Sequence, residues 1–481
     1  MELDMDLRSR QEVRELVGRA KAAQEQLKNM SQAQIDKIIA AIAQAGRENA
    51  KLLAEMACQE TGFGNVADKI IKNKFASEQV YEAIRDTKTV GILRQDTEKK
   101  VWEIGVPVGV IAGIAPSTNP TSTVIYKSMI ALKGGNAIVL SPHPAAVQCS
   151  LKAAQVICDA ARSAGCPDGA IGCISHPTMD AVKELMAHPS VKLILATGGG
   201  AMVHAAYSSG KPAIGVGAGN GPAYIHRSAN VQKAVKDILR SKTFDNGTVC
   251  ASEQSIVVEQ CCADAVKEEF RRQGAYFLST AEAEKIAALL LRPNGSMNPK
   301  VVGKTAYDIA QMAGLSNVPR TTPVLIARET EAGPARPYSR EKLCPILAFF
   351  IEPNEDTVLE KVCEVLGNEG SGHTFAMHAE DEAVIRRFAL RVPVSRFIVN
   401  SPAALGGIGA TTGLFPAMTL GCGAVGGSSS SNNIGPFDLI NIRRVAWGIH
   451  EPDGGHTTTG NLSISDDIVA ALTEQILKKL R

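Results

Sequence analysis

From Val106 onward, the chain alternates short apolar segments with longer segments of helical pattern, and this alternation restricts the possible folds most. The apolar runs have the length of strands, and in the segments between them apolar residues return every three or four positions. Strand, helix and strand at this spacing predict a parallel sheet with helices on both faces. The expected strands of this first lobe are 108–114, 137–140, 170–174 and 191–196, and its expected helices are 121–132, 145–164 and 180–187.

A second α/β lobe is predicted after residue 230, where the alternation resumes. Ahead of both lobes, a short polar lead precedes a capping box at Ser31 and an amphipathic helical layer that extends to about Arg85. Residues 89–106 mix β-branched and charged residues in two runs and predict a two-stranded ribbon. Strands are expected near 254–258, 324–327, 346–351 and 397–400, and a closing strand at 437–445.

Charge and hydropathy exclude two classes of function. Basic and acidic residues are nearly balanced, at 51 and 49, and no basic run marks a nucleic-acid surface. The longest apolar stretch, residues 106–115, is interrupted by Pro107 and is too short to cross a bilayer. We therefore expect no nucleic-acid partner and no membrane span.

The cysteines and histidines form no metal-binding or disulfide pattern. No two of the eleven cysteines are spaced C-x-x-C, and the acidic start differs from a secretory signal. Reduced thiols and a cytoplasmic protein are therefore expected. The nine histidines show no H-E-x-x-H or other ligand spacing, so no metal is expected.

Cys250 follows a glycine-containing turn and precedes the apolar run 255–258. A thiol at such a junction can meet substrate while the strand holds its backbone, although many buried cysteines are inert. The segment 243–254, Thr-Phe-Asp-Asn-Gly-Thr-Val-Cys-Ala-Ser-Glu-Gln, resembles the catalytic-cysteine segment of the aldehyde dehydrogenase superfamily. It is most similar to that of the CoA-acylating branch. The resemblance implies that Cys250 is the nucleophile.

A glycine turn after the strand 191–196 opens a helix, but it lacks the last glycine of G-x-G-x-x-G. Its backbone N–H groups can bind a phosphate, or the turn can be purely structural. The resemblance implies an NAD-binding loop at Thr197, Gly198 and Gly199. Ser141 and Pro142 stand where hydrolytic relatives have Lys-Pro, and this implies a contact with the cofactor that leaves NADP open as an alternative to NAD.

Three further residues receive roles by resemblance. Asn119, between two prolines at the end of a strand, is either a turn residue or the donor that the family aims at the oxyanion. Glu341 matches the glutamate that binds the nicotinamide ribose. His373 lies among glycines, so it is either a turn residue or a proton carrier, and the acylating branch has a matching histidine as the suggested base for the incoming thiol.

Val216 is the main departure from hydrolytic aldehyde dehydrogenases, which have a glutamate at the matching position. That glutamate activates the water that hydrolyses the thioester. Without such a base, the acyl-enzyme is expected to persist until a thiol such as CoA attacks it.

The resemblance covers about 31–448 and implies an α/β fold of the aldehyde dehydrogenase type, with two parallel-sheet lobes and a β-ribbon oligomerisation arm. Ribbon edges would be unpaired in a monomer, so a homodimer or homotetramer is expected. The expected domains are an NAD-binding domain at 1–226 that includes the ribbon 89–106, a catalytic domain at 227–436, an oligomerisation strand at 437–453, and a linker with a C-terminal amphipathic helix at 454–481.

The implied activity is reversible oxidation of a short-chain aldehyde to the acyl-CoA thioester, with NAD and coenzyme A, through a thiohemiacetal and a thioester on Cys250. Three alternatives stay open. They are a hydrolytic, CoA-independent aldehyde dehydrogenase, a phosphorylating semialdehyde reductase, and a non-catalytic interaction protein on the same scaffold.

The C-terminal residues 462–481 predict an amphipathic helix after a glycine- and threonine-rich linker. A helix this short needs a partner for its apolar stripe, either its own subunit or another protein. It resembles the short helices that target acylating aldehyde dehydrogenases to the shell of bacterial microcompartments. That resemblance implies a shell-protein partner and a location inside a microcompartment. The apolar stripe comprises Ile468, Val469, Leu472, Ile476 and Leu480.

Overall fold

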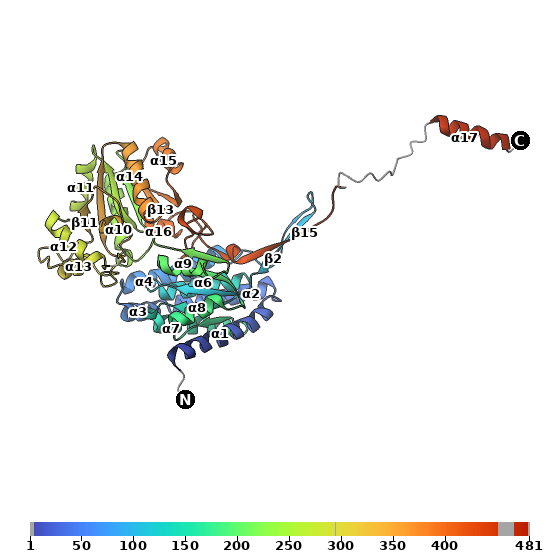
Figure 1. Ribbon diagram of the computed structural model, residues 1–481, viewed down its shortest axis with the longest axis horizontal. Helices are drawn as coiled ribbons and strands as arrows, with labels where there is room; N and C mark the ends of the chain where they lie inside the picture. Colours follow the sequence, from blue (N-terminus) through green and yellow to red (C-terminus); the bar gives the residue numbers. More distant parts are fainter. Residues whose placement is uncertain (1–3, 294, 451–465, 480–481) are drawn as a thin grey trace.

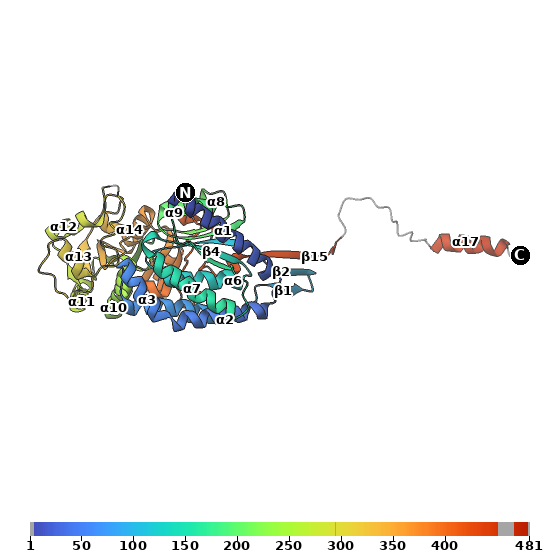
Figure 2. The same ribbon diagram turned by 90° about the horizontal axis from the view of Figure 1, so that it is seen from below.

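The structure is a computed structural model that describes residues 4–293, 295–450 and 466–479. Two α/β lobes lie side by side, and a long ribbon extends from the first lobe (Figure 1). The turned view shows the same separation of the two lobes and the ribbon (Figure 2). None of the described helices combines the length and apolar character that a membrane span requires.

The first lobe contains a parallel five-stranded sheet in the order β5-β4-β3-β6-β7. Two of its inner strands, 110–115 and 137–142, are buried along their whole length, which explains their largely apolar sequence. The strands are β3 (Val110–Ala115), β4 (Ala137–Pro142), β5 (Ile171–Cys173), β6 (Val191–Thr197) and β7 (Ala213–Val216). The helices between them are α6 (Pro120–Lys133), α7 (Val147–Ser163), α8 (Met179–Ala187) and α9 (Gly200–Tyr207). The predicted strands and helices of this lobe are confirmed, and β7 is an addition.

The N-terminal layer begins earlier than predicted, because the polar lead is itself the 23-residue helix α1 (Met5–Leu27). Its buried side includes Val13, Val17, Ala20, Ala23 and Leu27, but the charged residues on its exposed side dominate its sequence. The capping box at Ser31 is confirmed and starts α2 (Gln32–Glu48). The layer continues with α3 (Ala50–Thr61), α4 (Val66–Lys74), the π-helical turn Phe75–Gln79 and α5 (Val80–Ile84).

The second lobe contains a parallel seven-stranded sheet in the order β10-β11-β12-β9-β8-β13-β14. Its strands are β8 (Gly221–Ile225), β9 (Glu253–Glu259), β10 (Tyr276–Phe277), β11 (Leu325–Arg328), β12 (Ile346–Glu352), β13 (Gly372–His378) and β14 (Val394–Val399). Its helices are α10 (Val231–Thr243), α11 (Ala263–Arg272), α12 (Thr280–Leu290), α13 (Ala306–Met312), α14 (Glu355–Asn368), α15 (Glu382–Ala389) and α16 (Ala403–Gly407).

The strand assignments bear on two features of this lobe, the expected boundary at residue 226 and the placement of His373. Strand β8 already belongs to the second sheet, so the chain passes between the lobes at 217–220 and not at the expected boundary of 226. His373 lies on the buried strand β13 and not in a turn. Glycines concealed the start of β13, because Gly370 and Gly372 have the positive φ angles of a turn.

The ribbon is a three-stranded antiparallel sheet in the order β1-β2-β15. Its strands are β1 (Gly91–Asp96), β2 (Val101–Pro107) and β15 (Ile440–Ala446), and the predicted closing strand therefore starts after a 3₁₀ turn at Pro436–Leu439. Near the tip, Trp102 and Trp447 meet edge to face with ring centroids 5.0 Å apart, and both rings are partly exposed.

The predicted C-terminal helix is present as α17 (Asp466–Lys479), which lies apart from both lobes in Figures 1 and 2. Its described side chains Val469, Ile476 and Leu477 are 49%, 56% and 60% exposed. The predicted linker 454–460, the side chains of Ile468 and Leu472, and Leu480 lie outside the described residues.

Candidate active site

A cavity of about 610 Å³ lies between the two lobes, at the carboxyl ends of β3, β4 and β6. Open α/β sheets bind ligands at this edge. The cavity brings together all but one of the residues that the sequence singled out. Its lining includes Asn119, Ser141, Pro142, Thr197, Gly198, Gly199, Val216, Cys250 and Glu341.

Cys250 lies between the 3₁₀ turn Phe244–Gly247 and β9, so a strand buried along its whole length holds the next residues in place. The turn is sharp because Asp245 and Asn246 adopt φ angles of 49° and 53°. Burial, followed by the charge of Glu341, raises the pKa of the Cys250 thiol to about 12. The thiol is therefore protonated at neutral pH in the enzyme without ligands.

Gly219 packs directly on the backbone of Cys250. A Cβ atom at Gly219 would lie 1.9 Å from the carbonyl oxygen of Cys250, so no larger residue fits at this position. The same position is 3.2 Å from the imidazole carbon Cε1 of His373. The loop 217–220 therefore packs between the backbone of Cys250 and the imidazole of His373.

Asn119 is the residue immediately before α6, and its side chain makes no capping hydrogen bond to that helix. Its Oδ1 instead accepts a hydrogen bond from Lys72 Nζ at 2.6 Å, and its Nδ2 donates to Thr118 Oγ1 at 3.1 Å. One N–H of the amide is left over. Asn119 and Cys250 line the same cavity, so this N–H is available to a negatively charged oxygen formed at the thiol.

A second, smaller pocket of about 60 Å³ also reaches Cys250 and Asn119. Its wall is largely apolar and comes from the N-terminal helical layer and from the segments 405–410 and 418–420. The thiol thus lies where a large cavity meets a small apolar one, and a short apolar substituent fits the small pocket. The apolar residues are Ile71, Phe75, Phe244, Val249, Leu405, Ile408, Ala410, Met418 and Leu420.

The large cavity fits a dinucleotide. Helix α9 starts at Gly200 after Gly199, and no side chain caps its N-terminus, so its first N–H groups are available to a phosphate. A Cβ atom at Gly199 or Gly200 would meet nothing within 4 Å, so there is room for a ligand against the backbone. Beyond the glycines, Pro177 and Met179 form an apolar wall for a ring. Thr197, Ser141 and Pro142 lie on the same surface.

Glu341 lines this cavity, and its carboxylate accepts a hydrogen bond from the protein backbone. Its Oε1 accepts a hydrogen bond from the Gly219 N–H at 2.7 Å, and its own N–H donates to Glu369 Oε2 at 2.7 Å. Burial, with the nearby charge of Glu369 adding to it, raises the pKa of Glu341 to about 8. Glu341 is the one carboxylate among the residues that line the large cavity.

His373 is the one predicted site residue that does not line the cavity. It is fully buried, and its Nδ1 lies 2.9 Å from Thr374 Oγ1. Its Nε2 has no hydrogen-bond partner among the residues that the structure describes. Burial, and then the charge of Arg396, lowers the pKa of His373 to about 3. The imidazole is therefore neutral at physiological pH.

Sequence reasoning missed a buried ionic group beside the site, made by Lys69, Lys72 and Asp245. Lys69 Nζ lies 2.8 Å from Asp245 Oδ2, and Lys72 Nζ forms a second ion pair with the same oxygen. A charged Asp245 in the otherwise uncharged segment 243–250 was the available signal. Its partners lie more than 170 positions away in the chain, and no local pattern identifies them.

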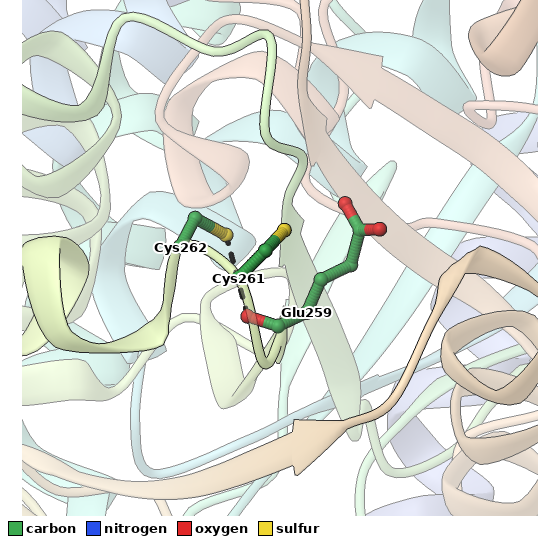
Figure 3. A group of neighbouring side chains, drawn as sticks. All are labelled: Glu259, Cys261 and Cys262. Carbon is green, nitrogen blue, oxygen red and sulfur yellow. Dashed lines mark hydrogen bonds between the residues drawn. The ribbon is translucent and has the colours of Figure 1, made fainter.

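One group of potential metal ligands converges in the described part of the chain, at Glu259, Cys261 and Cys262 (Figure 3). The Cys262 thiol donates to the backbone carbonyl of Glu259 at 3.5 Å, as the figure shows. Arg227 forms a bidentate ion pair with the Glu259 carboxylate. That carboxylate is already neutralised, so the group does not form a cation site.

Comparison with known proteins places these features in a family. The model of the aldehyde dehydrogenase family matches residues 3–277. A curated relative, the bifunctional aldehyde-alcohol dehydrogenase AdhE of Escherichia coli (strain K12), is 45% identical over 440 residues, which are 90% of this chain and 49% of that protein. The chain therefore spans about half the length of this relative.

Solved structures match the chain over nearly its whole length. An acetylating aldehyde dehydrogenase from Geobacillus thermoglucosidasius is 52% identical with a TM-score of 0.93, covering 94% of this chain and 100% of that one. A propionaldehyde dehydrogenase from Rhodopseudomonas palustris, solved with bound CoA and an acylated cysteine, is 28% identical with a TM-score of 0.81, covering 90% and 97%.

Proposed function

The chain belongs to the aldehyde dehydrogenase family, and on this basis we propose that it oxidises a short-chain aldehyde to an acyl-CoA thioester with NAD and CoA. The observation that carries the proposal is the position of Cys250. Its thiol lies at the junction of a dinucleotide-sized cavity and a small apolar pocket, and the wall of the large cavity has Val216 at the position where hydrolytic relatives have their base. The similar acetylating and CoA-bound enzymes support a thiol as the acyl acceptor.

In the first step the Cys250 thiol loses its proton to solvent, and the thiolate attacks the aldehyde carbon with the aldehyde substituent in the small pocket. The carbonyl oxygen becomes negatively charged, and the Asn119 Nδ2 donates a hydrogen bond to it. Such a donor contributes about 3 kcal/mol to transition-state stabilisation. Because the small pocket measures about 60 Å³, it favours an aldehyde with a short chain.

NAD bound in the large cavity supplies the hydride acceptor that converts the thiohemiacetal into a thioester. We assign its phosphates to the N-terminus of α9, next to Thr197, Gly198 and Gly199, and its ring wall to Pro177 and Met179. Ser141 and Pro142 contact the adenosine half, and Glu341 binds the ribose next to the nicotinamide. With Ser141 in place of a lysine, NADP also fits this assignment.

CoA then attacks the thioester carbon through its sulfur, the bond to the Cys250 sulfur breaks, and the acyl group leaves as acyl-CoA. The proton of the CoA thiol needs an acceptor. His373 is the candidate, because its imidazole is neutral and its Nε2 is without a partner among the described residues. One thioester replaces another, so the reaction runs in both directions.

The enzyme acts as a homodimer or homotetramer through the ribbon β1-β2-β15. A single copy leaves the outer strands β1 and β15 with one neighbour each, and unpaired strand edges favour association. Trp102 and Trp447 provide an exposed aromatic contact near the ribbon tip. In a symmetric dimer, the paired ribbons cover both the open strand edges and the exposed tryptophans.

Helix α17 binds a microcompartment shell protein, and the enzyme functions inside that compartment. Exposed Val469, Ile476 and Leu477 support this assignment, because a 14-residue helix is marginal in water without a partner for its apolar side chains. The last turn is basic, at Lys478 and Lys479, and the start of the helix is acidic, so both ends carry the charge that the helix dipole favours.

The reverse half-reaction tests the covalent step directly. Incubation with propionyl-CoA is expected to place a propionyl group on the peptide that contains Cys250, and added CoA is expected to remove it. Mass spectrometry of the digested protein measures both. Cys250→Ala is expected to remain unmodified, whereas Cys363→Ala, which changes a thiol outside the site, is expected to behave as the wild type.

A further inference from the structure

Lys69 and Lys72 project from α4 onto a single buried carboxylate, Asp245. Both lysine side chains are 3% exposed, and the aspartate is 0% exposed. Burial raises the pKa of Asp245, but the two ammonium groups together bring it below its ordinary value. Charges this deep are retained only where every donor and acceptor has a partner. The group must therefore be held in one arrangement.

Lys72 has three N–H donors and three acceptors around it. They are Asp245 through Oδ2, Thr248 Oγ1 at 3.0 Å and Asn119 Oδ1 at 2.6 Å. Thr248 lies two positions before Cys250 and itself donates to Asp245 Oδ2 at 2.7 Å. Lys72 thus joins the cysteine turn to the side chain of Asn119, on the wall of the small pocket.

An ammonium group can only donate, so it determines which end of the Asn119 amide faces it. The oxygen must point to Lys72, and the NH₂ group must point away from it. If the amide turned by 180°, its oxygen would face the negatively charged oxygen that forms at Cys250. The two ends of an amide are nearly equal in shape, so packing alone does not exclude that orientation.

We propose that Lys72 is a positioning residue that fixes the Asn119 amide with its N–H toward the oxyanion at Cys250. The proposal rests on the proposed function, because it needs an oxyanion at that thiol. The ammonium also polarises the amide and strengthens its remaining N–H as a donor. Lys72 itself has no donor left for substrate, so it acts only through Asn119.

Lys69 provides a matched control. It binds the same oxygen of Asp245, at 2.8 Å, and is equally buried, but its remaining contact is the backbone carbonyl of Thr118, at 3.1 Å. Lys69→Met and Lys72→Met each remove one ammonium from the same carboxylate. Only Lys72→Met leaves the oxygen of Asn119 without its donor.

The test is a double-mutant cycle of Lys72→Met with Asn119→Ala, measured as the burst of nitrophenol released when p-nitrophenyl acetate acylates Cys250. This acylation passes through the same oxyanion and needs neither NAD nor CoA. Asn119→Ala is expected to slow the burst by about 10²–10³-fold, and Lys72→Met by at least about tenfold. The double variant is expected to be no slower than Asn119→Ala within about threefold.

A structural role for Lys72 predicts different results. If Lys69→Met slows the burst as much as Lys72→Met, or if the losses of Lys72→Met and Asn119→Ala multiply, the proposal is overturned. Alkylation of Cys250 by iodoacetamide forms no oxyanion, and its rate is expected to stay within about threefold in Lys72→Met. If Lys72→Met does not fold, Lys72→Leu, which also lacks an N–H donor, replaces it under the same criteria.

The ester burst separates this inference from the proposed function. A wild-type enzyme that gives no acyl-CoA from aldehydes contradicts the proposed function, and the cycle on the ester still decides the role of Lys72. An enzyme that forms acyl-CoA while the two losses multiply contradicts the role of Lys72 alone.

Discussion

The carboxylate of Glu341 accepts a hydrogen bond from the Gly219 N–H at 2.7 Å, in the loop that packs on the carbonyl oxygen of Cys250. A carboxylate held there places a negative charge near the thiol, and this charge is the second cause, after burial, of the raised pKa of Cys250. The same side chain is the proposed ligand of the nicotinamide ribose. We therefore expect cofactor binding to alter the reactivity of the Cys250 thiol through Glu341.

Glu341→Gln is expected to accelerate alkylation of Cys250 by iodoacetamide at pH 9 by about three- to tenfold, because removal of the charge lowers the thiol pKa and raises the thiolate fraction. In the wild type Glu341 is ionised above about pH 9, and the thiol pKa of about 12 then predicts a rate that rises about tenfold per pH unit between pH 9 and 11. Rates measured by mass spectrometry of the Cys250 peptide check both. Glu364→Gln, at a surface site, is expected to change nothing, and equal rates in Glu341→Gln and the wild type would remove Glu341 from this role.

Val216→Glu is expected to add hydrolysis, since it introduces a carboxylate on the wall of the cavity that holds Cys250. The measurement is free carboxylic acid formed from an aldehyde and NAD without CoA. Val216→Gln introduces a side chain of nearly the same volume as glutamate but without a basic group. This variant is expected to form no more acid than the wild type. Equal acid from the glutamate and glutamine variants would mean that the shape of the pocket, and not the missing base, selects the acceptor.

His373→Gln is expected to spare the first half of the reaction and slow the second by about 10²-fold, the lower range for general base catalysis. In stopped-flow experiments, the NADH burst from aldehyde stays near one equivalent per active site while steady turnover with CoA falls. The pKa of about 3 means that the imidazole is neutral above about pH 4, so its protonation is not expected to limit activity between pH 5 and 8. If the NADH burst instead falls in proportion to steady turnover, the role of His373 is to support the loop that packs on Cys250.

Deletion of 462–481 is expected to leave kcat unchanged, because α17 contributes no residue to either cavity. The same residues fused to a fluorescent protein are expected to colocalise with an assembled microcompartment shell. Ile476→Glu in the fusion places a charge on an exposed apolar position and is expected to make it diffuse. A deletion variant without activity, together with a diffuse parent fusion, would favour a helix that docks on its own enzyme.

The sequence was sufficient for elements whose pattern is local. The apolar runs of β3, β4 and β6 are buried on both faces, so their sequence is continuous and easy to recognise. Helix α1 was missed because the many charged residues on its exposed side outweigh the short buried stripe of Val13, Val17, Ala20 and Leu27. Strand β13 was missed because glycines with positive φ precede it.

The candidate site likewise contains residues that a local pattern identifies and residues that only the packing of the chain brings in. Cys250, Asn119 and Glu341 lie in segments similar to family motifs, and one cavity brings them together. The contact of Lys72 with Asn119 and Asp245 depends on the packing of α4 against the cysteine turn, and no spacing in the chain encodes it. Likewise, the burial of His373 behind the loop 217–220 follows from sheet order, which the sequence did not specify.

The most direct test of the account is the product balance of a single reaction with propionaldehyde and NAD, run with CoA, with inorganic phosphate, or with neither. The account predicts one acyl-CoA for each NADH when CoA is present. Without CoA it predicts no turnover beyond a burst of about one NADH per active site, and phosphate is not expected to change that. Sustained NADH formation without CoA, matched by an equal amount of free propionate or propionyl phosphate, would contradict the account.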